Sequence, residues 1–451
     1  MQACGPDRDS PLPVDVQQLY RLAKSLIPGG TQLLSKRPEM FAPEQWPGYY
    51  REARGCEILG WDGRRYLDMS IMGVGSCLLG YGDPDVTEAV MRRVQAGSMC
   101  TLNGAEEVEL ARLLTGLHPW AGSVRYARTG GEAMAVAVRI ARARTRRDRV
   151  AFCGYHGWHD WYLAANRVPG GQADRLDGHL LPGLDPGGVP SQLAGTAIPF
   201  RYNDPDQLAA IVREHGRHLA AVVMEPTRAV EPRPGFLESV RELCDASGAV
   251  LVFDEITAGW RLARGGAHLR YAVRPDVAVF AKALGNGHPM AAIIGRPEVM
   301  QAAQESFISS TYWTEGVGPA AALATVHKML RVDVPAHVAR MGTRWRQGLQ
   351  EIAQQHGVAL SFSGHPPITS IRFEHPDAAA LQTLLTVRML RRGILAGPAF
   401  YASLAHREEH VDRYLAAADE IFAELAAAAE HGDAAARIGG PVRHSGFARL
   451  A

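Results

Sequence analysis

The chain has 451 residues, more than one simple hydrophobic core accommodates, so we expect a large domain with one or more smaller lobes. Lysine and arginine together number 48 and aspartate and glutamate 47, which leaves a net charge of +1. This balance excludes a whole-molecule field that would attract nucleic acid or an anionic membrane, and we expect neither as a partner.

Six cysteines are scattered along the chain without a C-x-x-C or zinc-finger spacing, which argues against a disulfide framework and against a structural metal. The first residues, "MQACGPDRDSPLP", lack the apolar core of a signal peptide. No run elsewhere approaches about 18 uninterrupted apolar residues. These features favour a reducing compartment, and we expect a cytoplasmic protein.

The N-terminal segment, residues 1–62, contains a predicted helix over residues 17–30 that ends in Gly29 and Gly30. We expect this segment to pack with a smaller C-terminal lobe. From residue 63 to about 330, short apolar runs alternate with helical stretches, as in βα units around a mainly parallel sheet. The sequence therefore predicts an α/β fold for a large domain over residues 63–330.

A candidate phosphate site lies in "RYARTGGEAMAVAVRIARARTRR". Thr129, Gly130 and Gly131 form a small turn, and the helix predicted after it places four apolar side chains on one face, namely Met134, Ala137, Val138 and Ala141. Backbone N–H groups at this helix start, with the Thr129 hydroxyl, would bind an anion. Most glycine turns before helices are only turns, so the motif carries weight only beside others.

The next motif is "CGYHGWHDW", directly after the predicted strand "RVAFCG". Tyr155 suits an aromatic plate stacked on a flat cofactor, with a core tyrosine as the plain alternative. His156 and His159 lack a third ligand at matching spacing, which disfavours a metal site.

Three apolar runs end on ionisable groups. "AAVVME" ends on Glu225, "AVLVFDE" on Asp254 and Glu255, and "VAVFAK" on Lys282. Continuous apolar runs are typical of strands covered on both faces. Since ligands of open α/β sheets bind beyond the carboxyl ends of the strands, we expect these charges to converge on one crevice.

A lysine at a strand end more often lays its stem along apolar surface, but in a desolvated crevice it becomes a nucleophilic amine. Pyridoxal phosphate needs such a lysine for a Schiff base, a carboxylate that keeps the pyridine nitrogen protonated, and a phosphate cradle. Lys282, Asp254 and the turn at Thr129 would supply them. An aldolase would need the lysine alone, and the motifs G-x-S-x-G of hydrolases and G-x-G-x-x-G of dinucleotide sites do not occur in the required context.

From residue 321 the pattern changes to helices mixed with short strands. We expect a helix over residues 321–357 with a hinge within it, strands over 368–375 and 391–397, and a helix over 407–428. These elements predict a smaller α+β domain over residues 331–451, whose alanine-rich end from residue 431 is expected to be a loosely held, flexible tail.

Taken together, these motifs resemble the class III aminotransferases, pyridoxal-phosphate enzymes of fold type I. "FDEITAGWR" resembles the family's F-D-E-V-x-T-G-F-R, "FAKALGNGHPMAAIIG" its lysine strand and glycine turn, and "RTGGEAMAVAVRIAR" its N-S-G-T-E-A phosphate loop. The resemblance covers nearly the whole chain and favours the branch that contains glutamate-1-semialdehyde aminomutase. It implies a large domain with a mainly parallel sheet of the seven-stranded type and a smaller α+β domain.

The resemblance also implies a role for each matched residue. Lys282 would form the Schiff base and shuttle the proton, Asp254 would pair with the pyridine nitrogen, Tyr155 and Ile256 would cover the two ring faces, Thr129, Gly130 and Gly131 would hold the phosphate, and Glu225 and Glu255 would support the site. Thr314, in "STYWTEGVGP", would reach the phosphate of the neighbouring subunit, so we expect a homodimer with shared active sites.

Departures from the aminomutase pattern concern the substrate. Gly131 replaces a hydroxyl residue of the phosphate loop, "GGTQLLSKRPEMF" with Gln32, Leu33 and Leu34 replaces G-G-V-N-S-P, and "AFYASLAH" replaces an acidic loop. The sequence in these segments is more similar to the branch that acts on amino sugars in aminoglycoside antibiotic biosynthesis. The aromatic side chains of Tyr312, Trp313 and Tyr401 offer flat surfaces for a sugar ring.

We therefore expect amino transfer at an amino-sugar carbonyl, with glutamate or glutamine as the donor. Intramolecular amino transfer, epimerisation at an amine-bearing carbon, and a scaffold that has lost catalysis and acts as a binding module are the alternatives.

Overall fold

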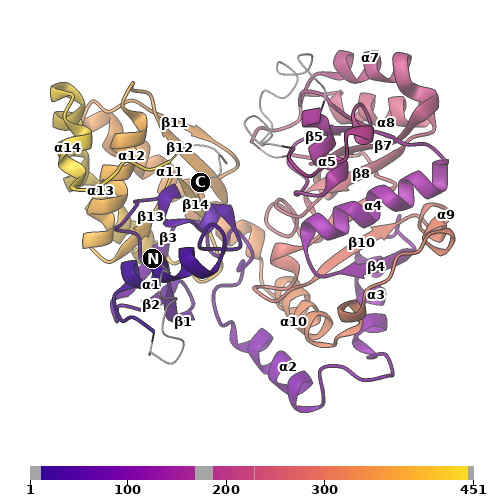
Figure 1. The fold of residues 1–451 in the computed structure, drawn as a ribbon, viewed down its shortest axis with the longest axis horizontal. Coiled ribbons are helices and arrows are strands. Elements are labelled where there is room, and N and C mark those ends of the chain that lie inside the picture. The colour runs from indigo at the N-terminus through magenta and orange to yellow at the C-terminus, as the bar shows by residue number, and fades with distance from the viewer. Residues whose placement is uncertain (1–11, 168–185, 228, 445–451) are drawn as a thin grey trace, which may run out of the picture.

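The structure of the protein is a computed structural model that describes residues 12–167, 186–227 and 229–444. Figure 1 shows two lobes. One lobe holds the first and last parts of the chain, and the other holds the middle part with most of the βα units.

The larger lobe is built on a seven-stranded sheet. Its strands, in spatial order, are β4 (Ser123–Ala127), β10 (Ala291–Gly295), β9 (Val277–Phe280), β8 (Val250–Asp254), β7 (Leu219–Met224), β5 (Arg149–Cys153) and β6 (Ala197–Pro199). From β9 to β6 all neighbours are parallel, whereas β10 runs antiparallel to both β9 and β4. The predicted α/β fold with a mainly parallel sheet is confirmed.

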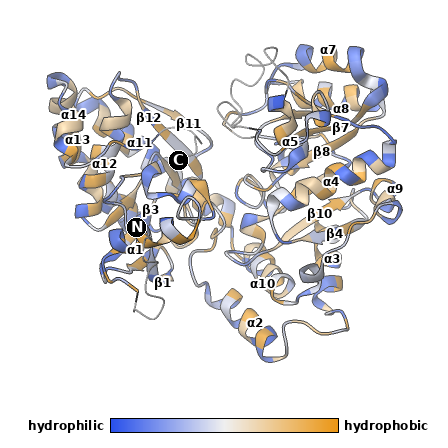
Figure 2. Cartoon of the chain, in the orientation of Figure 1, coloured by the Kyte–Doolittle hydropathy of each residue, from blue (hydrophilic) through white to orange (hydrophobic). Residues whose placement is uncertain are grey.

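Helices cover both faces of this sheet, which explains its continuous apolar strands. They are α4 (Gly130–Thr145) and α9 (Pro297–Met300) on one face, and α7 (Pro205–His215) and α8 (Phe236–Ser247) on the other. Val223 and Val252 pack in one core cluster with α4, whereas Val222 and Leu251 pack in another with α7 and α8. Figure 2 shows the expected alternation of hydrophobic and hydrophilic residues along α4 and α7.

Helix α4 begins where the sequence predicts. Thr129 is its N-cap, and the four side chains predicted to share one face, Met134, Ala137, Val138 and Ala141, are all fully buried. Other helices in the described part of this lobe are α2 (Pro84–Gln95), α3 (Glu106–Leu117), α5 (Asp160–Leu163) and α10 (Val317–Arg331).

The smaller lobe joins the two ends of the chain through a four-stranded sheet. Its order is β1 (Tyr50–Arg54), β2 (Glu57–Gly60), β3 (Arg65–Met69) and β13 (Ile394–Ala396), with β3 and β13 parallel. A three-stranded sheet lies in the same lobe, with the order β11 (Leu360–Ser363), β12 (Ile368–Phe373) and β14 (Ala399–Tyr401). The helices are α1 (Val16–Leu26), α11 (Val334–Gln355), α12 (Ala378–Arg391), α13 (Glu408–His431) and α14 (Ala434–Ile438).

The structure corrects two expectations for this region. The predicted helix over residues 321–357 is two helices, because Asp333 caps α11 by accepting from the Ala336 N–H at 3.3 Å and Pro335 occupies its first turn. The alanine-rich segment that begins at residue 431 was expected to be flexible, but it packs against the smaller lobe up to residue 444. Ile438 of α14 is fully buried, and the Arg443 side chain donates to the carbonyl of Met40 at 2.9 Å.

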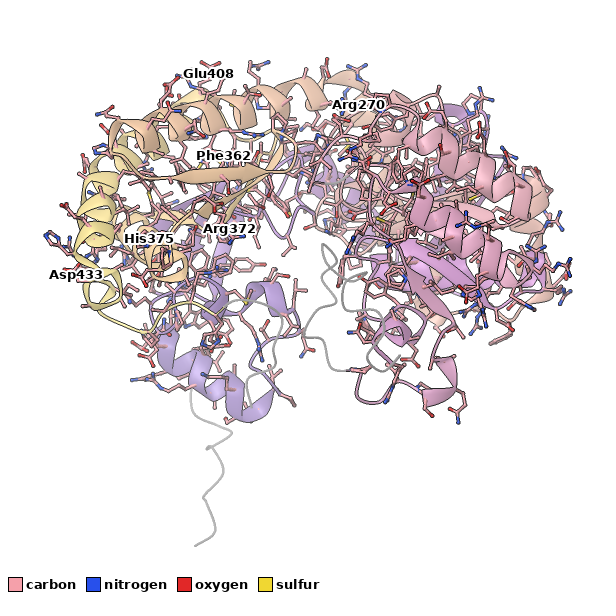
Figure 3. All side chains as sticks on the ribbon, turned by 90° about the horizontal axis from the view of Figure 1, so that it is seen from above. Arg270, Phe362, Arg372, His375, Glu408 and Asp433 are labelled. Carbon is pink, nitrogen blue, oxygen red and sulfur yellow. The ribbon has the colours of Figure 1, made fainter. Side chains whose placement is uncertain are left out.

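The two lobes contact each other beside the three-stranded sheet. Thr227, which follows β7, forms a 2.6 Å hydrogen bond with His365 of the β11–β12 turn, and the Gly364 N–H donates to the carbonyl of Ala229. Figure 3 shows this side from above, with Phe362 of β11 in one lobe and Arg270 in the other. Along the described parts of the chain, no helix has the length and apolar character needed to span a bilayer.

Candidate active site

The carboxyl ends of four neighbouring parallel strands place most of the predicted site residues at one edge of the large sheet. Tyr155 follows β5, Glu225 follows β7, Asp254 ends β8 and Lys282 follows β9. These strands are adjacent in the order β9-β8-β7-β5. The structure therefore brings the four residues to a common edge.

Lys282 lies just beyond the end of the apolar strand β9, and its backbone leaves the strand conformation. The strand ends at Phe280, and Lys282 begins a short 3-10 turn with a φ of +45°, a conformation uncommon for a residue other than glycine. Its half-buried side chain donates from Nζ to Thr257 Oγ1 at 2.9 Å. In a strand conformation the chain at Lys282 would have continued in the direction of β9. The turn instead directs the amine to Thr257, in the loop after β8.

Asp254 is buried, with 3% of its surface exposed, and is held by two hydrogen bonds. Its Oδ1 accepts from the Ile256 N–H at 2.9 Å, and its Oδ2 lies 2.7 Å from His156 Nδ1. The other nitrogen of His156, Nε2, lies 3.0 Å from the carbonyl of Cys153. Both neighbours of the imidazole are acceptors, so an N–H on either ring nitrogen finds a partner, and the ring fixes the orientation of the buried carboxylate.

From its sequence context His156 was considered only as a metal ligand, and its contact with Asp254 was not predicted. Thr257 was also missed. A signal for His156 was present, because it follows a strand of the same parallel sheet that carries Asp254.

Glu225 and Glu255 differ in their surroundings. Glu225 is buried at the mouth of β7, where a Cβ added to Gly154 would lie 2.8 Å from its Oε2. Glu255 points elsewhere, since it accepts from the N–H groups of Ala267 and His268 and from His268 Nδ1, at 2.7–2.9 Å. Glu255 thus braces the loop after β8.

The N-terminus of α4 is where the sequence predicts a phosphate cradle, and its cap is formed by Thr129. Thr129 Oγ1 accepts from the Glu132 N–H at 3.4 Å, and Glu132 Oε2 accepts from the Thr129 N–H at 3.3 Å, which is a capping box. The cap uses Thr129 as an acceptor, so its hydroxyl proton can be donated to an anion. A Cβ added to Gly130 would lie 2.9 Å from Ile256 Cδ1, which places the Ile256 side chain directly over the start of the helix.

Thr314 lies on the exposed short helix Thr311–Thr314, and Tyr312 beside it is 70% exposed. This segment is fixed to its own chain, because Arg128 donates to the carbonyl oxygens of Trp313 and Glu315 at 2.9 and 2.8 Å. Trp313 Nε1 donates to Glu132 Oε1 at 2.9 Å, which fixes the indole ring against the start of α4.

A buried arginine closes the site on the side of the smaller lobe. Arg261 is 1% exposed and donates to the carbonyl oxygens of Gly75, Thr257 and Ala402 at 2.5–3.5 Å. Burial lowers its pKa to about 10. Its guanidinium carbon lies 6.0 Å from the ring centroid of Tyr401, so Tyr401 borders the Lys282–Thr257 pair through Arg261.

A capped helix N-terminus with two glycines, a lysine amine and a buried carboxylate at the carboxyl edge of one sheet are the groups that a pyridoxal-phosphate transferase of fold type I requires. The sequence profile described as Aminotransferase class-III matches residues 41–404. The chain belongs to this family of enzymes, which use pyridoxal phosphate and act on small-molecule amines and carbonyl compounds.

The relatives carry different names at similar identity. The chain is 30% identical over 417 residues to 3-aminobutyryl-CoA aminotransferase of Cloacimonas acidaminovorans, covering 90% of this chain and 95% of the relative. It is 32% identical over 434 residues to glutamate-1-semialdehyde 2,1-aminomutase of Syntrophobacter fumaroxidans, covering 90% and 97%. It is 31% identical over 375 residues to 2'-deamino-2'-hydroxyneamine transaminase of Streptomyces kanamyceticus, covering 82% and 89%.

Among solved structures, the FumI protein of Sphingopyxis sp. MTA144 in its PLP internal aldimine form superimposes with a TM-score of 0.82. The two sequences are 25% identical, and the match covers 92% of this chain and 97% of that one. Fold and cofactor predicted from the sequence are therefore confirmed, whereas these names do not agree on a substrate.

The residues of this chain fit the cofactor. Thr129 at the start of α4 has a hydroxyl proton that it can donate to an anion, and Asp254 is buried with hydrogen bonds that keep it in place. The His159 Nδ1 atom is buried beside Gly131 and has no hydrogen-bond partner within the described residues, as expected where a polar ligand group completes the site.

Proposed function

We propose that this aminotransferase moves an amino group between an amine-bearing position of an amino sugar and the corresponding carbonyl compound, with glutamate or glutamine as the other amine. The observation that carries the proposal is the state of Arg261. This buried cation next to Thr257 donates to three backbone carbonyl oxygens, which leaves it poorly placed to bind a substrate carboxylate. In its half-reaction a sugar amine needs no such cation, whereas glutamate-1-semialdehyde brings a carboxylate. The carboxylate of glutamate or glutamine, in the other half-reaction, has to be bound by a group other than Arg261.

Two further features support a sugar. Tyr401 is half-buried beside Arg261 and offers an aromatic face with a hydroxyl. The similarity to a transaminase named for a neamine derivative points to the same substrate class.

Each site residue has a defined task in this proposal. When bound, pyridoxal phosphate supplies an aldehyde and a ring that accepts electrons. Lys282 holds and moves the proton at the reacting carbon, and Thr257 orients its Nζ. Asp254, fixed by His156, keeps a proton on the pyridine nitrogen. Thr129 and the N–H groups of Gly130 and Gly131 bind the phosphate, Tyr155 and Ile256 enclose the ring, and Glu225 lines the site.

The proposed active unit is a homodimer in which Thr314 reaches the phosphate of the partner. Its exposure on a segment anchored to the large lobe supports this, because an exposed hydroxyl held rigidly is suited to contact a second copy.

The experiment is a half-reaction with one candidate amine at a time. Purified enzyme with bound cofactor is mixed with amine-bearing aminoglycosides, glutamate, glutamine and simple ω-amino acids, and the cofactor absorbance is followed as the aldehyde is converted to the amine. We expect conversion with an aminoglycoside and with glutamate or glutamine. Lys282→Ala enzyme is the control, and conversion only with ω-amino acids would refute the sugar substrate.

A second candidate is intramolecular amino transfer, favoured by the 32% identity to an aminomutase. Its distinguishing result is isomerisation of glutamate-1-semialdehyde without any external amine while aminoglycosides leave the cofactor unchanged.

A further inference from the structure

The loop after β5 approaches the start of α4 more closely than side chains would permit. A Cβ added to Gly157 would lie 2.8 Å from the Gly131 Cα, and Gly157 has a φ of +104°. Glycine at both positions is what lets the two backbones touch. The contact places the next residues of the loop, Trp158 and His159, over the first turn of the helix.

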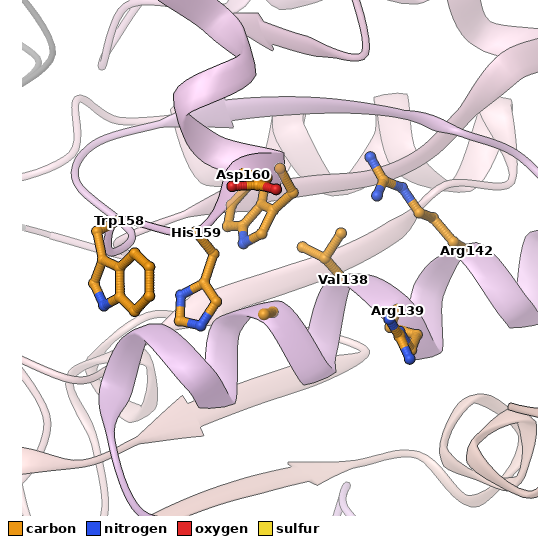
Figure 4. A pocket seen from close by; sticks show the side chains of 8 residues that line it. Val138, Arg139, Arg142, Trp158, His159 and Asp160 are labelled. Atoms are coloured by element: carbon orange, nitrogen blue, oxygen red, sulfur yellow. The ribbon is translucent and has the colours of Figure 1, made fainter. Parts of the chain in front are cut away.

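His159 occupies the space that a side chain at position 131 would need. A Cβ added to Gly131 would lie 3.2 Å from His159 Nδ1 and 3.3 Å from its Cε1. Figure 4 shows the imidazole above the first turns of α4, beside Trp158, whose ring stacks on it at a centroid distance of 4.4 Å. The backbone at Gly131 is not in the left-handed region, so its conformation does not require glycine.

One nitrogen of the His159 imidazole, Nδ1, is buried without a hydrogen-bond partner among the described residues. A buried polar atom without a partner costs about 1–3 kcal/mol, so such atoms are normally completed by a ligand or by water. The atom faces the missing side chain of Gly131, at the helix end where N–H groups and the helix dipole favour an anion.

We infer that His159 binds the phosphate of the cofactor, as a substitute for the hydroxyl side chain that position 131 lacks. The inference rests on the proposed placement of the phosphate at the N-terminus of α4. Glycine at position 131 leaves space for the imidazole of His159. The imidazole in turn supplies a hydrogen-bond donor in place of the hydroxyl group that glycine lacks.

The test compares the affinity of apoenzyme for pyridoxal phosphate and for pyridoxal, which lacks the phosphate, by quenching of tryptophan fluorescence. In His159→Ala we expect binding of pyridoxal phosphate to weaken about 10- to 100-fold, the range for a hydrogen bond to a charged group, with pyridoxal unchanged. His218→Ala removes an exposed histidine at the opposite end of the sheet and is the matched control.

A second pair of variants keeps the result independent of folding defects. Gly131→Thr alone crowds His159 and should also weaken binding of pyridoxal phosphate, whereas Gly131→Thr with His159→Ala restores a hydroxyl in an uncrowded space and should recover most of the affinity. A purely structural role of His159 would make the two losses add.

Thr129→Val separates this inference from the placement on which it rests. If Thr129→Val weakens binding of pyridoxal phosphate but His159→Ala does not, His159 is not a phosphate ligand although the phosphate lies at α4. If neither variant weakens it, the phosphate binds elsewhere and both ideas fail. Equal losses for pyridoxal phosphate and pyridoxal in His159→Ala would also overturn the inference.

Discussion

The pair formed by His156 and Asp254 allows a quantitative prediction. Replacing His156 by alanine removes a 2.7 Å contact to a carboxylate that is 3% exposed and a 3.0 Å contact to the Cys153 carbonyl. The first loss leaves a charge buried without its partner, and the second leaves a buried carbonyl with one hydrogen bond fewer. Removing one member of a buried pair destabilises by about 3–5 kcal/mol, which we expect for His156→Ala.

The origin of this cost can be separated by a double-mutant cycle. In an Asp254→Asn background no charge remains, so His156→Ala should cost only about 1–2 kcal/mol, the loss of neutral hydrogen bonds and of packing. The assay is urea unfolding of the apoenzyme followed by circular dichroism, with the midpoint compared at constant m. His218→Ala, an exposed histidine, should stay within about 0.5 kcal/mol of the wild type.

The result that would refute the reasoning is an equal cost of His156→Ala in both backgrounds. In that case the carboxylate would not depend on the imidazole, and the effect would be one of packing. A loss below about 1 kcal/mol in the Asp254 background would show that the pair is not buried in the sense that the structure implies.

Three further predictions concern the amine, the partner subunit and pH. Lys282→Ala should keep the circular dichroism spectrum and lose turnover, because Phe280 and the other apolar residues of β9 are untouched; retained turnover with an unchanged cofactor spectrum would remove Lys282 from catalysis. Mixing Lys282→Ala chains with Thr314→Ala chains should restore up to about a quarter of wild-type activity, since random pairing makes half the dimers hybrid with one intact site each; no recovery despite proven exchange of subunits would contradict shared sites. Burial lowers the pKa of His406 to about 4, while the unfolded chain binds this proton near pH 6.5. The stability that His406 contributes is therefore complete above about pH 6.5 and declines by at most about 3 kcal/mol as the pH falls to about 4, and His406→Asn should flatten this part of a plot of unfolding midpoint against pH.

The central strands could be predicted because burial on both faces requires a continuous run of apolar residues. β7, β8 and β9 are covered on both faces, so every residue of each is buried and apolar until the ionisable residue at the end. By contrast, β1 is exposed at four of its five residues, and β14 has only three residues, so neither shows a pattern that distinguishes a strand from a loop. The pairing of β3 with β13 joins segments more than 300 residues apart, which no local pattern reports.

The same distinction holds within the site. Lys282 and Asp254 could be placed together because Asp254 ends β8, Lys282 follows β9 by two residues, and the carboxyl ends of parallel strands share an edge. Thr257 and His156 reach the site from loops, and the paths of these loops depend on contacts such as that between Gly131 and Gly157. The sequence shows where the glycines are, but it does not show which other segment of backbone each glycine contacts.

Position 131 shows where reading a motif residue by residue leads to an incomplete conclusion. Within the phosphate loop, glycine in place of a hydroxyl residue is a loss, and the sequence predicts that backbone groups or Thr314 must compensate. In the structure the loss at position 131 coincides with a gain from a different strand connection, because the ring of His159 fills the space and brings a buried nitrogen with it. A Cβ at position 131 would lie 3.2 Å from His159 Nδ1, so a hydroxyl side chain at 131 and the imidazole at 159 crowd each other. We therefore expect the two positions to be coupled, with each group more favourable where the other is absent. Whether a chain of this family keeps its phosphate affinity after a change at one of these positions should then depend on the residue at the other, a dependence that the four variants of the Gly131–His159 cycle measure directly.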